Sequence, residues 1–467
     1  MNADTPTQDA DQDLLMRPHL VVHPSGEIYI KSSRTRRRFH RLLADHVRTC
    51  LTRSAPQTRL IDRKQNLRVV GEDLDAASQA LSRVFGVHRV TMVHPIQIED
   101  LDSLADTVGA LAIESVRGRT FAVRVRRKGT HTWSSLDASL AIARRLFDVA
   151  RGVDLTNPER TVKIEVRQDI AYLVTEQWDG PRGLPSGGQE RSLSLISGGF
   201  DSPVATWMMM RRGSQVDFIH FTLECSQSEH ALGVAHALRE QWGSGPSPIF
   251  WRVDFQPARE ALLEFVESRY RQVVLKQLMI ATADALADRL GIHALITGDS
   301  VGQVSSQTLS HLAAIDRYAN RSVIRPLAGM LKEEIIDWSR RIGTASISER
   351  AKEVCDLSDG PVAVFARWAR LEEAHKCLPP EIISEALSHL DAVALDDWMP
   401  GLPFVKVISE APSDRPTVTA DMVNDTEGPI AVTGRHAARA ASRLTTEGRD
   451  VLIVLRPDKT VPFEISA

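Results

Sequence analysis

A short run of small and acidic residues, Ser197-Gly198-Gly199-Phe200-Asp201-Ser202, stands between an apolar segment, RSLSLI, and a segment with helical character, PVATWMMMRRG. Glycines let a backbone turn tightly and bring its N–H groups close to an anion, and the N-terminus of a following helix adds about half a positive charge. We expect Ser202 to cap that helix, with Pro203 as its first residue. The run therefore predicts a loop that binds a phosphate group.

Two features of this loop indicate which kind of phosphate-binding loop it is. It lacks the GxxxxGK[ST] spacing of Walker-type nucleotide-binding loops. The Asp201 carboxylate would repel a nucleotide unless a divalent cation lay between them, so a metal beside Asp201 is expected. A strand, an SGGxDS loop and a helix in this order resemble the PP-loop of ATP pyrophosphatases, which cleave ATP to AMP and pyrophosphate while adenylylating a substrate. The alternative is an ordinary glycine-rich turn.

A second polar loop, from Thr297 to Leu309, follows the predicted strand HALIT. Open α/β sheets bind ligands at the carboxyl edge of their strands, and polar groups are costly to place there unless they are hydrogen-bonded. Lys276, in a predicted helical stretch over about 258–290, and Lys332, at the start of a later helix, are candidates for contacts with ATP phosphates. Each could instead be a surface lysine.

The elements that must position these residues alternate between strand and helix from residue 191 onward. The strands are RSLSLI, VDFIHFTLE, IFWRVDF and HALIT, and this alternation predicts a parallel α/β domain over 190–380. The segment GPRGLPSGGQE before it reads as a linker. After about residue 380 an acidic connector leads to a short α/β unit over 400–467, in which the strands PIAVTG and DVLIVLRP flank the helix RHAARAASRLTTEG.

Two smaller α+β units are expected before the linker, over 17–72 and 73–180, behind a disordered tail over 1–16 that carries four Asp and no Lys or Arg. Both units are rich in basic residues. The residues predicted to contact nucleic acid are Arg36, Arg37, Arg38, Arg124, Arg126, Arg127 and Lys128. In the strand TFAVRVRRKG, alternation places Arg124 and Arg126 on one face and the valines on the other. Two such clusters favour a polyanionic partner, the alternative being solvated surfaces.

Composition excludes several classes of protein. At 467 residues the chain should hold about three folding units. No run approaches the roughly 20 apolar residues that span a bilayer, and the N-terminus is acidic, so we expect a cytoplasmic protein without a membrane segment. The four cysteines are scattered and form no CxxC pair, which predicts reduced thiols. The spacing of His230 and His236 does not place them on one helical face, so no metal is assigned there.

Three motifs together resemble those of the bacterial tRNA 4-thiouridine synthetases, also called tRNA sulfurtransferases: LISGGFDSPVA, LITGDSVGQVSSQTL and RPLAGMLKEEII. The second is the most diagnostic, because the SGGxDS loop alone is shared with GMP synthetase and other enzymes. The resemblance covers most of the chain. The stretches GEIYIKSSRTRRRFHRLL and VRVRRKGTHTWSSLDA look like that family's ferredoxin-like and THUMP domains, which bind tRNA.

The resemblance implies that ATP and Mg²⁺ are used to replace the O4 of uridine 8 in tRNA by sulfur. The uridine oxygen attacks the α-phosphate, pyrophosphate leaves, and a persulfide or sulfide displaces AMP. By motif match, the family's contacts with ATP fall on Leu195, Ile196, Lys276, Gly298 and Gln307. The carboxylate that assists the metal falls on Asp201. Homodimerisation is implied by the same analogy.

Sulfur transfer in the family uses cysteines, and the resemblance places one of them at Cys355. A thiol there could attack a persulfide, the alternative being a buried structural cysteine. Relatives with a rhodanese domain carry a second cysteine where this chain reads PIAVTGRHAARAASRL, so 400–467 resembles a degenerate rhodanese-like remnant. A role in thiamine thiazole synthesis, which in some relatives belongs to the rhodanese part, is correspondingly disfavoured.

Three sulfur routes are open: Cys355 acts with Cys225 or Cys377, Cys355 acts with an external donor such as a cysteine desulfurase, or sulfide is used directly. We favour the external donor. Two other functions remain as alternatives, a tRNA-binding protein that has lost thiolation and a PP-loop enzyme that modifies another RNA or a small molecule. The intact GQVSSQTL loop argues against the first, and the two basic clusters argue against the second.

Overall fold

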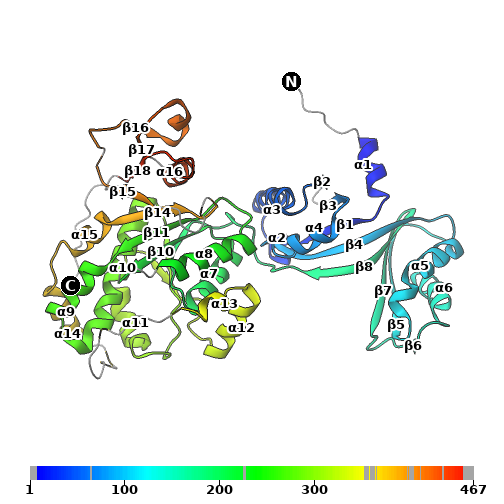
Figure 1. The fold of residues 1–467 in the computed structure, drawn as a ribbon. Helices are drawn as coiled ribbons and strands as arrows, with labels where there is room; N and C mark the ends of the chain where they lie inside the picture. The colour runs from blue at the N-terminus through cyan, green and yellow to red at the C-terminus, as the bar shows by residue number, and fades with distance from the viewer. Residues whose placement is uncertain are drawn as a thin grey trace. The chain divides into compact units, whose positions relative to one another are not determined.

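The computed structural model describes residues 8–63, 66–223, 228–351, 357, 363, 365, 367–396, 398, 404–410, 412–433 and 436–455. The chain forms two units, Met1–Pro185 and Ser186–Ala467 (Figure 1). Each unit contains one mixed or largely parallel sheet with helices packed on it, as expected for an α/β protein of several domains.

The first unit contains an eight-stranded sheet of order β2-β3-β1-β4-β8-β7-β5-β6. Its strands are β1 (His19–Pro24), β2 (Thr58–Arg63), β3 (Asn66–Gly71), β4 (Val87–Gln97), β5 (Thr120–Lys128), β6 (Gly152–Val153), β7 (Arg160–Arg167) and β8 (Ile170–Asp179). Its helices are α1 (Gln8–Leu15), α2 (Gly26–Tyr29), α3 (Ser33–Ser54), α4 (Leu74–Leu81), α5 (Leu101–Val116) and α6 (Ser135–Leu146). The long antiparallel pair β4 and β8 joins two halves, each with its own apolar core.

Local sequence signals explain where these helices begin. The Ser32 hydroxyl accepts a hydrogen bond from the backbone N–H of Thr35 at the start of α3. At α6, Ser134 and Asp137 form a reciprocal capping box. The segment LVVHPSGEIYIK has a β-like pattern, but the strand β1 ends at Pro24 and Gly26–Tyr29 forms the helical turn α2. Ile28 of that turn is buried in the same core as Phe39 and Leu43 of α3. Its apolar side chain therefore fills the core from a helical turn and not from a strand.

The acidic N-terminal segment is only partly described, and the described part is ordered. Residues 8–15, expected within a disordered tail, form α1. The carboxylate of Asp11 accepts hydrogen bonds from the guanidinium groups of Arg59 and Arg63 on β2, at 2.8 and 3.4 Å. Composition alone misses such a helix, because the cations that hold it lie about 50 positions away along the chain.

The second unit contains a ten-stranded sheet of order β13-β12-β9-β10-β11-β14-β15-β18-β17-β16. Its strands are β9 (Ser192–Leu195), β10 (Val216–Thr222), β11 (Ile249–Asp254), β12 (Ala294–Ile296), β13 (Ser322–Ile324), β14 (Leu390–Ala394), β15 (Val405–Ile408), β16 (Thr417–Thr419), β17 (Ile430–Thr433) and β18 (Val451–Val454). Strands β9 to β13 are mutually parallel, as predicted. Strand β14 runs antiparallel to both of its neighbours, β11 and β15.

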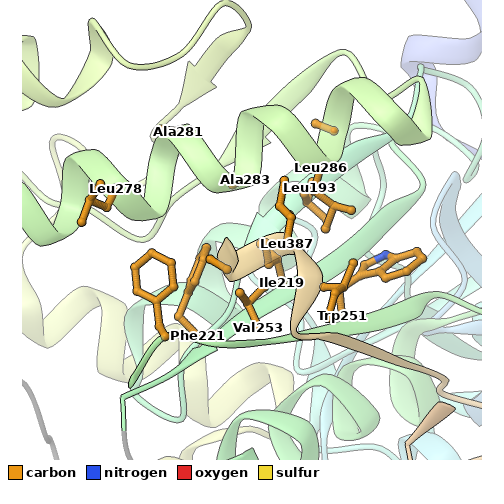
Figure 2. Packing of buried hydrophobic residues seen from close by; sticks show 14 of the residues in the cluster. Leu193, Ile219, Phe221, Trp251, Val253, Leu278, Ala281, Ala283, Leu286 and Leu387 are labelled. Atoms are coloured by element: carbon orange, nitrogen blue, oxygen red, sulfur yellow. The ribbon is translucent and has the colours of Figure 1, made fainter. Parts of the chain in front are cut away.

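The helices of this unit flank the sheet. They are α7 (Asp201–Arg211), α8 (Ser228–Trp242), α9 (Gln256–Phe265), α10 (Arg271–Leu290), α11 (Leu309–Asp316), α12 (Lys332–Ile342), α13 (Ala345–Ser348), α14 (Trp368–Lys376), α15 (Ile382–Ser388) and α16 (Ala437–Thr446), with 3₁₀ turns η1 (Ser268–Tyr270), η2 (Ser305–Gln307) and η3 (Ala420–Asp425). Figure 2 shows α10 lying along the sheet, with Leu286 next to Leu193 of β9 and Leu387 of α15 close to Ile219 of β10.

Two boundaries in this unit are set by single residues. Gly343 ends α12 in the left-handed conformation, with φ of 82°, as its position predicts. The helical stretch predicted over 258–290 is instead two helices, because the guanidinium of Arg271 donates to the carbonyls of Leu263 and Val266 at the end of α9. Those bonds satisfy carbonyl groups that a continuous helix would have used.

The segment after residue 380 is built into the same sheet. The expected connector contains α15 and β14, and β14 pairs with β11 over five residues. From β15 onward the strands β15, β18, β17 and β16 are parallel and extend the sheet. Ile430, Val432 and Leu444 belong to the same apolar core as Leu193 and Ile219. Among the residues that the structure describes, no helix is long and apolar enough to cross a membrane.

Candidate nucleotide site and basic surface

The predicted phosphate loop connects β9 to α7 at the carboxyl edge of the sheet. The half-buried Leu195 ends the strand, and the buried Ile196 donates its N–H to the carbonyl of Ile219 at 2.9 Å. Ser202 does not cap α7 as expected, because the helix already begins at Asp201. Instead its hydroxyl accepts the N–H of Ser197 at 2.9 Å and lies 3.1 Å from the Ser197 hydroxyl. Ser202 therefore closes the loop across its base.

Space, rather than an unusual backbone conformation, requires glycine in this loop. Neither Gly198 nor Gly199 has a positive φ. A Cβ on Gly198 would lie 2.8 Å from the Cβ of His230 and 3.1 Å from that of Ala351. Among the described residues, a Cβ on Gly199 would come within 4 Å of the Ser197 hydroxyl alone, at 3.6 Å. The loop is thus packed closely at Gly198 and open at Gly199.

The second polar loop comes directly against the first. A Cβ on Gly298 would lie 2.7 Å from the backbone nitrogen of Ser202 and 2.9 Å from the carbonyl carbon of Asp201. Strand β12, which ends at Ile296, pairs directly with β9. The loops that follow these two neighbouring strands therefore lie next to each other. The structure therefore juxtaposes two motifs that are about 100 positions apart in the sequence.

The Asp201 carboxylate connects both loops to α12. One oxygen accepts a hydrogen bond from the ammonium of Lys332 at 2.7 Å, and the other accepts from the amide nitrogen of Gln303 at 2.9 Å. The Lys332 ammonium also lies 5.8 Å from the centre of the Phe200 ring. A carboxylate and an ammonium are thus held at the N-terminus of α7, where the helix dipole favours an anion.

Asp299 forms a second, more deeply buried charge centre. Its carboxylate accepts hydrogen bonds from Lys276 at 3.0 Å, Gln307 at 3.1 Å, Thr297 at 2.8 Å and Arg325 at 3.3 Å. Burial by itself would raise the pKa of this carboxyl, but Lys276, Thr297 and Arg325 outweigh burial and hold the pKa at about 2. Asp299 is therefore ionised at every pH at which the protein would work.

The predicted site residues are brought together in this region, although their contacts with a nucleotide stay a prediction. The residues gathered at the loops are Leu195, Ile196, Ser197, Gly198, Gly199, Phe200, Asp201, Ser202, Lys276, Gly298, Gln307 and Lys332. Sequence reasoning missed Asp299, Gln303 and Arg325. The position of Asp299, three residues after a buried strand at the ligand-binding edge, was the signal that could have identified it.

The predicted sulfur-carrying thiols, Cys355 and Cys225, lie outside the described residues. The chain before Cys355 does reach the phosphate loop, since the Ser348 hydroxyl donates to the carbonyl of Gly199 at 3.1 Å. Cys377 is exposed at the end of α14. Cys50 lies in α3 of the first unit, and burial raises its pKa to about 11.

The first unit carries the predicted basic residues on its surface. On α3, Arg37 and Arg38 are exposed and Arg36 is half-buried, while Phe39 faces the core. On β5, Arg124, Arg126 and Lys128 are exposed, and Val123 on the opposite face is buried, as the alternation predicts. Arg127 is half-buried, with its guanidinium 5.7 Å from the centre of the Trp133 ring.

A hollow of about 950 Å³ lies over this part of the eight-stranded sheet. Its cationic lining residues are Arg68, Arg89, Arg124, Arg126, Lys163 and Arg167, and Glu165 is the acidic residue among them. Leu136 and Leu140 of α6, which are exposed, form part of an apolar wall. A positively charged hollow with apolar walls suits a polyanion that also presents flat, apolar groups.

Comparison with known proteins finds three family models that match successive parts of the chain. Residues 19–91 match the family described as "ThiI ferredoxin-like domain", residues 97–176 match "THUMP domain", and residues 187–376 match "Thiamine biosynthesis protein (ThiI)". The chain is 44% identical to a tRNA sulfurtransferase of Desulfurococcus amylolyticus over 356 residues, which is 75% of this chain and 73% of the relative. It is 33% identical to a tRNA sulfurtransferase of Vibrio atlanticus over 385 residues, 81% of this chain and 80% of the relative.

Two solved structures share the fold. The crystal structure of a 4-thiouridine synthetase–RNA complex with bound ATP covers 80% of this chain and 98% of its own, with a TM-score of 0.69 and 24% identity. The structure of PH1313 from Pyrococcus horikoshii covers 70% of this chain and 99% of its own, with a TM-score of 0.52 and 21% identity.

Proposed function

The chain belongs to the tRNA sulfurtransferase family, and from this premise we propose that it adenylylates uridine 8 of tRNA with ATP and replaces the O4 by sulfur. The products would be 4-thiouridine, AMP and pyrophosphate. The observation that carries this proposal is the junction of the two loops, in which Gly298 packs on the backbone of Asp201 and Ser202 at the N-terminus of α7. That junction supplies the parts that phosphoryl chemistry needs.

Attack of the uridine oxygen on a phosphorus atom requires alignment and charge neutralisation more than covalent help from the protein. The backbone N–H groups of the phosphate loop and the N-terminus of α7 would hold the phosphates. Lys332 and Lys276 would neutralise them, and both ammonium groups are already held in place, by Asp201 and by Asp299. Restricting the two lysines before the nucleotide binds lowers the entropy lost on binding.

The residues present fit a Mg²⁺ ion that is held largely by the nucleotide. Among the described residues no group of three or more His, Cys, Asp or Glu could hold a metal by itself. Mg²⁺ commonly binds through one or two carboxylates together with substrate phosphates and water. Asp201, whose side chain is 22% exposed beside the phosphate loop, would supply that carboxylate. Such an ion would offset negative charge on the leaving pyrophosphate.

Sulfur would come from an external persulfide donor such as a cysteine desulfurase. The persulfide sulfur would attack C4 of the adenylylated uridine and displace AMP, and the Cys355 thiolate would then cleave the resulting S–S bond. This releases 4-thiouridine and leaves a disulfide between Cys355 and the donor, which a free thiol such as cysteine reduces. This proposal is supported by the contact of Ser348 with the phosphate loop. Cys355 follows Ser348 by only seven positions in the sequence. It is also supported by the absence of cysteine from 400–467. The RNA would bind the basic surface of the first unit, in the cytoplasm, and the enzyme would act as a homodimer.

The test is 4-thiouridine formation in unmodified tRNA by the purified protein with ATP, Mg²⁺, cysteine and a cysteine desulfurase. We expect product from the wild type and none from Asp201→Ala or Cys355→Ser. Product that persists in Cys355→Ser would exclude this role of the Cys355 thiolate and favour direct use of sulfide. If the wild type binds tRNA but forms no product even with added sulfide, the protein is a tRNA-binding relative without thiolation activity.

A separate measurement, tRNA binding over a salt series, tests the basic surface of the first unit. Binding of tRNA should weaken steeply as salt rises, because each phosphate that the protein neutralises releases counterions. Salt-insensitive binding would exclude the basic surface of the first unit as the tRNA site.

A further inference from the structure

The Asp299 carboxylate accepts hydrogen bonds from two residues of the predicted nucleotide site, Lys276 and Gln307. We propose that Asp299 is a positioning residue for ATP, which orients the ammonium of Lys276 and the carboxamide of Gln307 for contact with the nucleotide. This inference rests on the proposed function, because it concerns how the same site holds its first substrate. On this proposal, the Asp299 carboxylate aligns Lys276 of α10 with Gln307 of η2.

Side chains from three segments meet at Asp299: helix α10, the residue after β13, and the second polar loop itself. Lys276 comes from α10, Gln307 from η2, Thr297 from the end of β12, and Arg325 from the residue after β13. The Asp299 side chain is 12% exposed, so these bonds form in a setting that excludes most water. Hydrogen bonds to a charged acceptor are stronger there than at the surface.

The two cations at Asp299 are held differently. Arg325 forms two further hydrogen bonds to the Asp316 carboxylate, at 2.9 and 2.7 Å, so its guanidinium is fixed from both sides. Lys276 directs one of its three N–H donors at Asp299 and keeps 27% of its side chain exposed. Arg325 therefore anchors Asp299, and Asp299 in turn orients an ammonium that can still reach a phosphate.

The orientation of Gln307 follows from the charge of its partner. A carboxylate accepts hydrogen bonds and cannot donate, so Gln307 must present its NH₂ group to Asp299. The other end of the carboxamide, Oε1, is buried and has no hydrogen-bond partner among the described residues. A buried acceptor without a partner is costly, and a hydroxyl or amino group of the nucleoside would satisfy it. Asp299 thereby determines that the ligand meets an acceptor at Gln307.

The test compares Asp299→Asn with Asp284→Asn. Asparagine has nearly the same shape but no charge, and its NH₂ group cannot accept from Lys276 or Gln307. We expect the KM and the calorimetric Kd for ATP to rise about tenfold or more, the range of a lost charge-assisted hydrogen bond. The kcat at saturating ATP should stay within about threefold of wild type, since aligned reactants would still react. Asp299→Glu, which restores the charge, should recover part of the affinity.

Asp284→Asn is the matched control. Asp284 is also a buried carboxylate of the second unit, and it is bonded to Arg321 and Asn320 away from the two loops. This variant should lower the melting temperature and leave the Kd for ATP unchanged. If Asp299→Asn lowers the melting temperature to a similar extent and leaves the Kd for ATP unchanged, Asp299 has a structural role only and the proposal is overturned.

Failure of the proposed function would look different. A wild-type protein that forms no 4-thiouridine would contradict that function, whereas the calorimetric Kd for ATP would still report on Asp299. Equal Kd values for wild type and Asp299→Asn would overturn the positioning role even if thiolation is intact.

Discussion

At the scale of single residues, the glycines of the two loops differ in how much room they have. Gly298→Ala and Gly198→Ala would each place a Cβ within 2.9 Å of a neighbouring atom, backbone in the first case. Overpacking of this kind costs about 1–3 kcal/mol. In Gly298→Ala it would push the second loop away from Asp201 and Ser202, and in Gly198→Ala it would push the phosphate loop away from His230 and Ala351. We expect both variants to lose ATP binding, measured by calorimetry. Gly199→Ala is the control, because its Cβ would have ordinary contacts, and a loss of binding in that variant equal to the other two would contradict this account.

His19 provides a prediction about pH. It is fully buried in β1, with Nδ1 2.9 Å from the carbonyl of Arg17 and Nε2 2.7 Å from the guanidinium of Arg68. Burial lowers the pKa of His19 to about 4, and the bond to Arg17 offsets only part of this effect. In the unfolded chain the pKa returns to 6.5, so the unfolded state binds more protons between pH 6.5 and 4.

The stability of the first unit should therefore be unaffected by His19 above pH 6.5 and should fall as the pH decreases toward 4. The loss amounts to about 3 kcal/mol when the pH is below both values. Hydrogen exchange of peptides from β1 and β3 across this pH range would measure it. His19→Gln keeps an acceptor for Arg68 but does not titrate, so its exchange should change less with pH. Identical pH dependence in both proteins would rule out His19 as the cause.

The role of a residue could be predicted from the sequence where the whole motif is one contiguous stretch of chain. The loop Ser197–Ser202 is contiguous between a strand and a helix, so its position at the sheet edge was predictable. The part played by Ser202 was not, because a serine one position inside the helix can bond either to the helix or back to Ser197. Asp299, Gln303 and Arg325 were missed because each acts through partners from other segments.

At the scale of elements, α1 leads to a prediction about RNA affinity. Arg63 lies directly opposite Asn66, and Ile61 opposite Arg68, so Arg59 and Arg63 share a face with residues that line the basic hollow. Asp11 of α1 pairs with both arginines. An acidic helix thus occupies the β2 edge of the surface on which we place tRNA.

Asp11→Asn should release Arg59 and Arg63 for contact with phosphates. We expect tighter tRNA binding at low salt, by about two- to fivefold, and a slope of log K against log salt that is steeper by about one unit for each added contact. Filter binding over a salt series would measure both. Asp13→Asn, an exposed substitution on the same helix, controls for the change in net charge. Equal slopes for wild type and Asp11→Asn would mean that these arginines do not meet the RNA.

Elements were predictable from the sequence where hydrophobic periodicity and end signals agree. The strands β9 to β12 and the end of α12 at Gly343 are of this kind. The helix α1 and the break between α9 and α10 were not, because Arg59, Arg63 and Arg271 set them through contacts that periodicity does not record.

At the scale of the whole molecule, the continuous ten-stranded sheet makes the C-terminal strands part of the second unit's core. Leu444 of α16 is 2% exposed and belongs to the same core as Leu193 and Ile219. We expect Leu444→Ala to destabilise the second unit by about 2–5 kcal/mol. The unfolding transition monitored at α16 should coincide with loss of ATP binding on heating. Met422→Ala, at an exposed position, should leave both unchanged.

Two separate transitions, with ATP binding surviving the first, would show instead that the C-terminal strands melt independently. The order of the strands could not have been predicted, since β14 inserts antiparallel between two parallel sets and no local signal specifies its partners.

The hydrogen bonds of β14 with β11 and β15 also bear on the kinetics of sulfur supply. A tethered carrier on a swinging domain delivers its cargo at a fixed effective concentration, independent of how much enzyme is present. Here the C-terminal strands are locked into the sheet and residues 400–467 contain no cysteine. On the proposed route with an external donor, thiolation should therefore be first order in the persulfide donor until the enzyme is saturated with it, and the rate in a cell would follow the abundance of that donor.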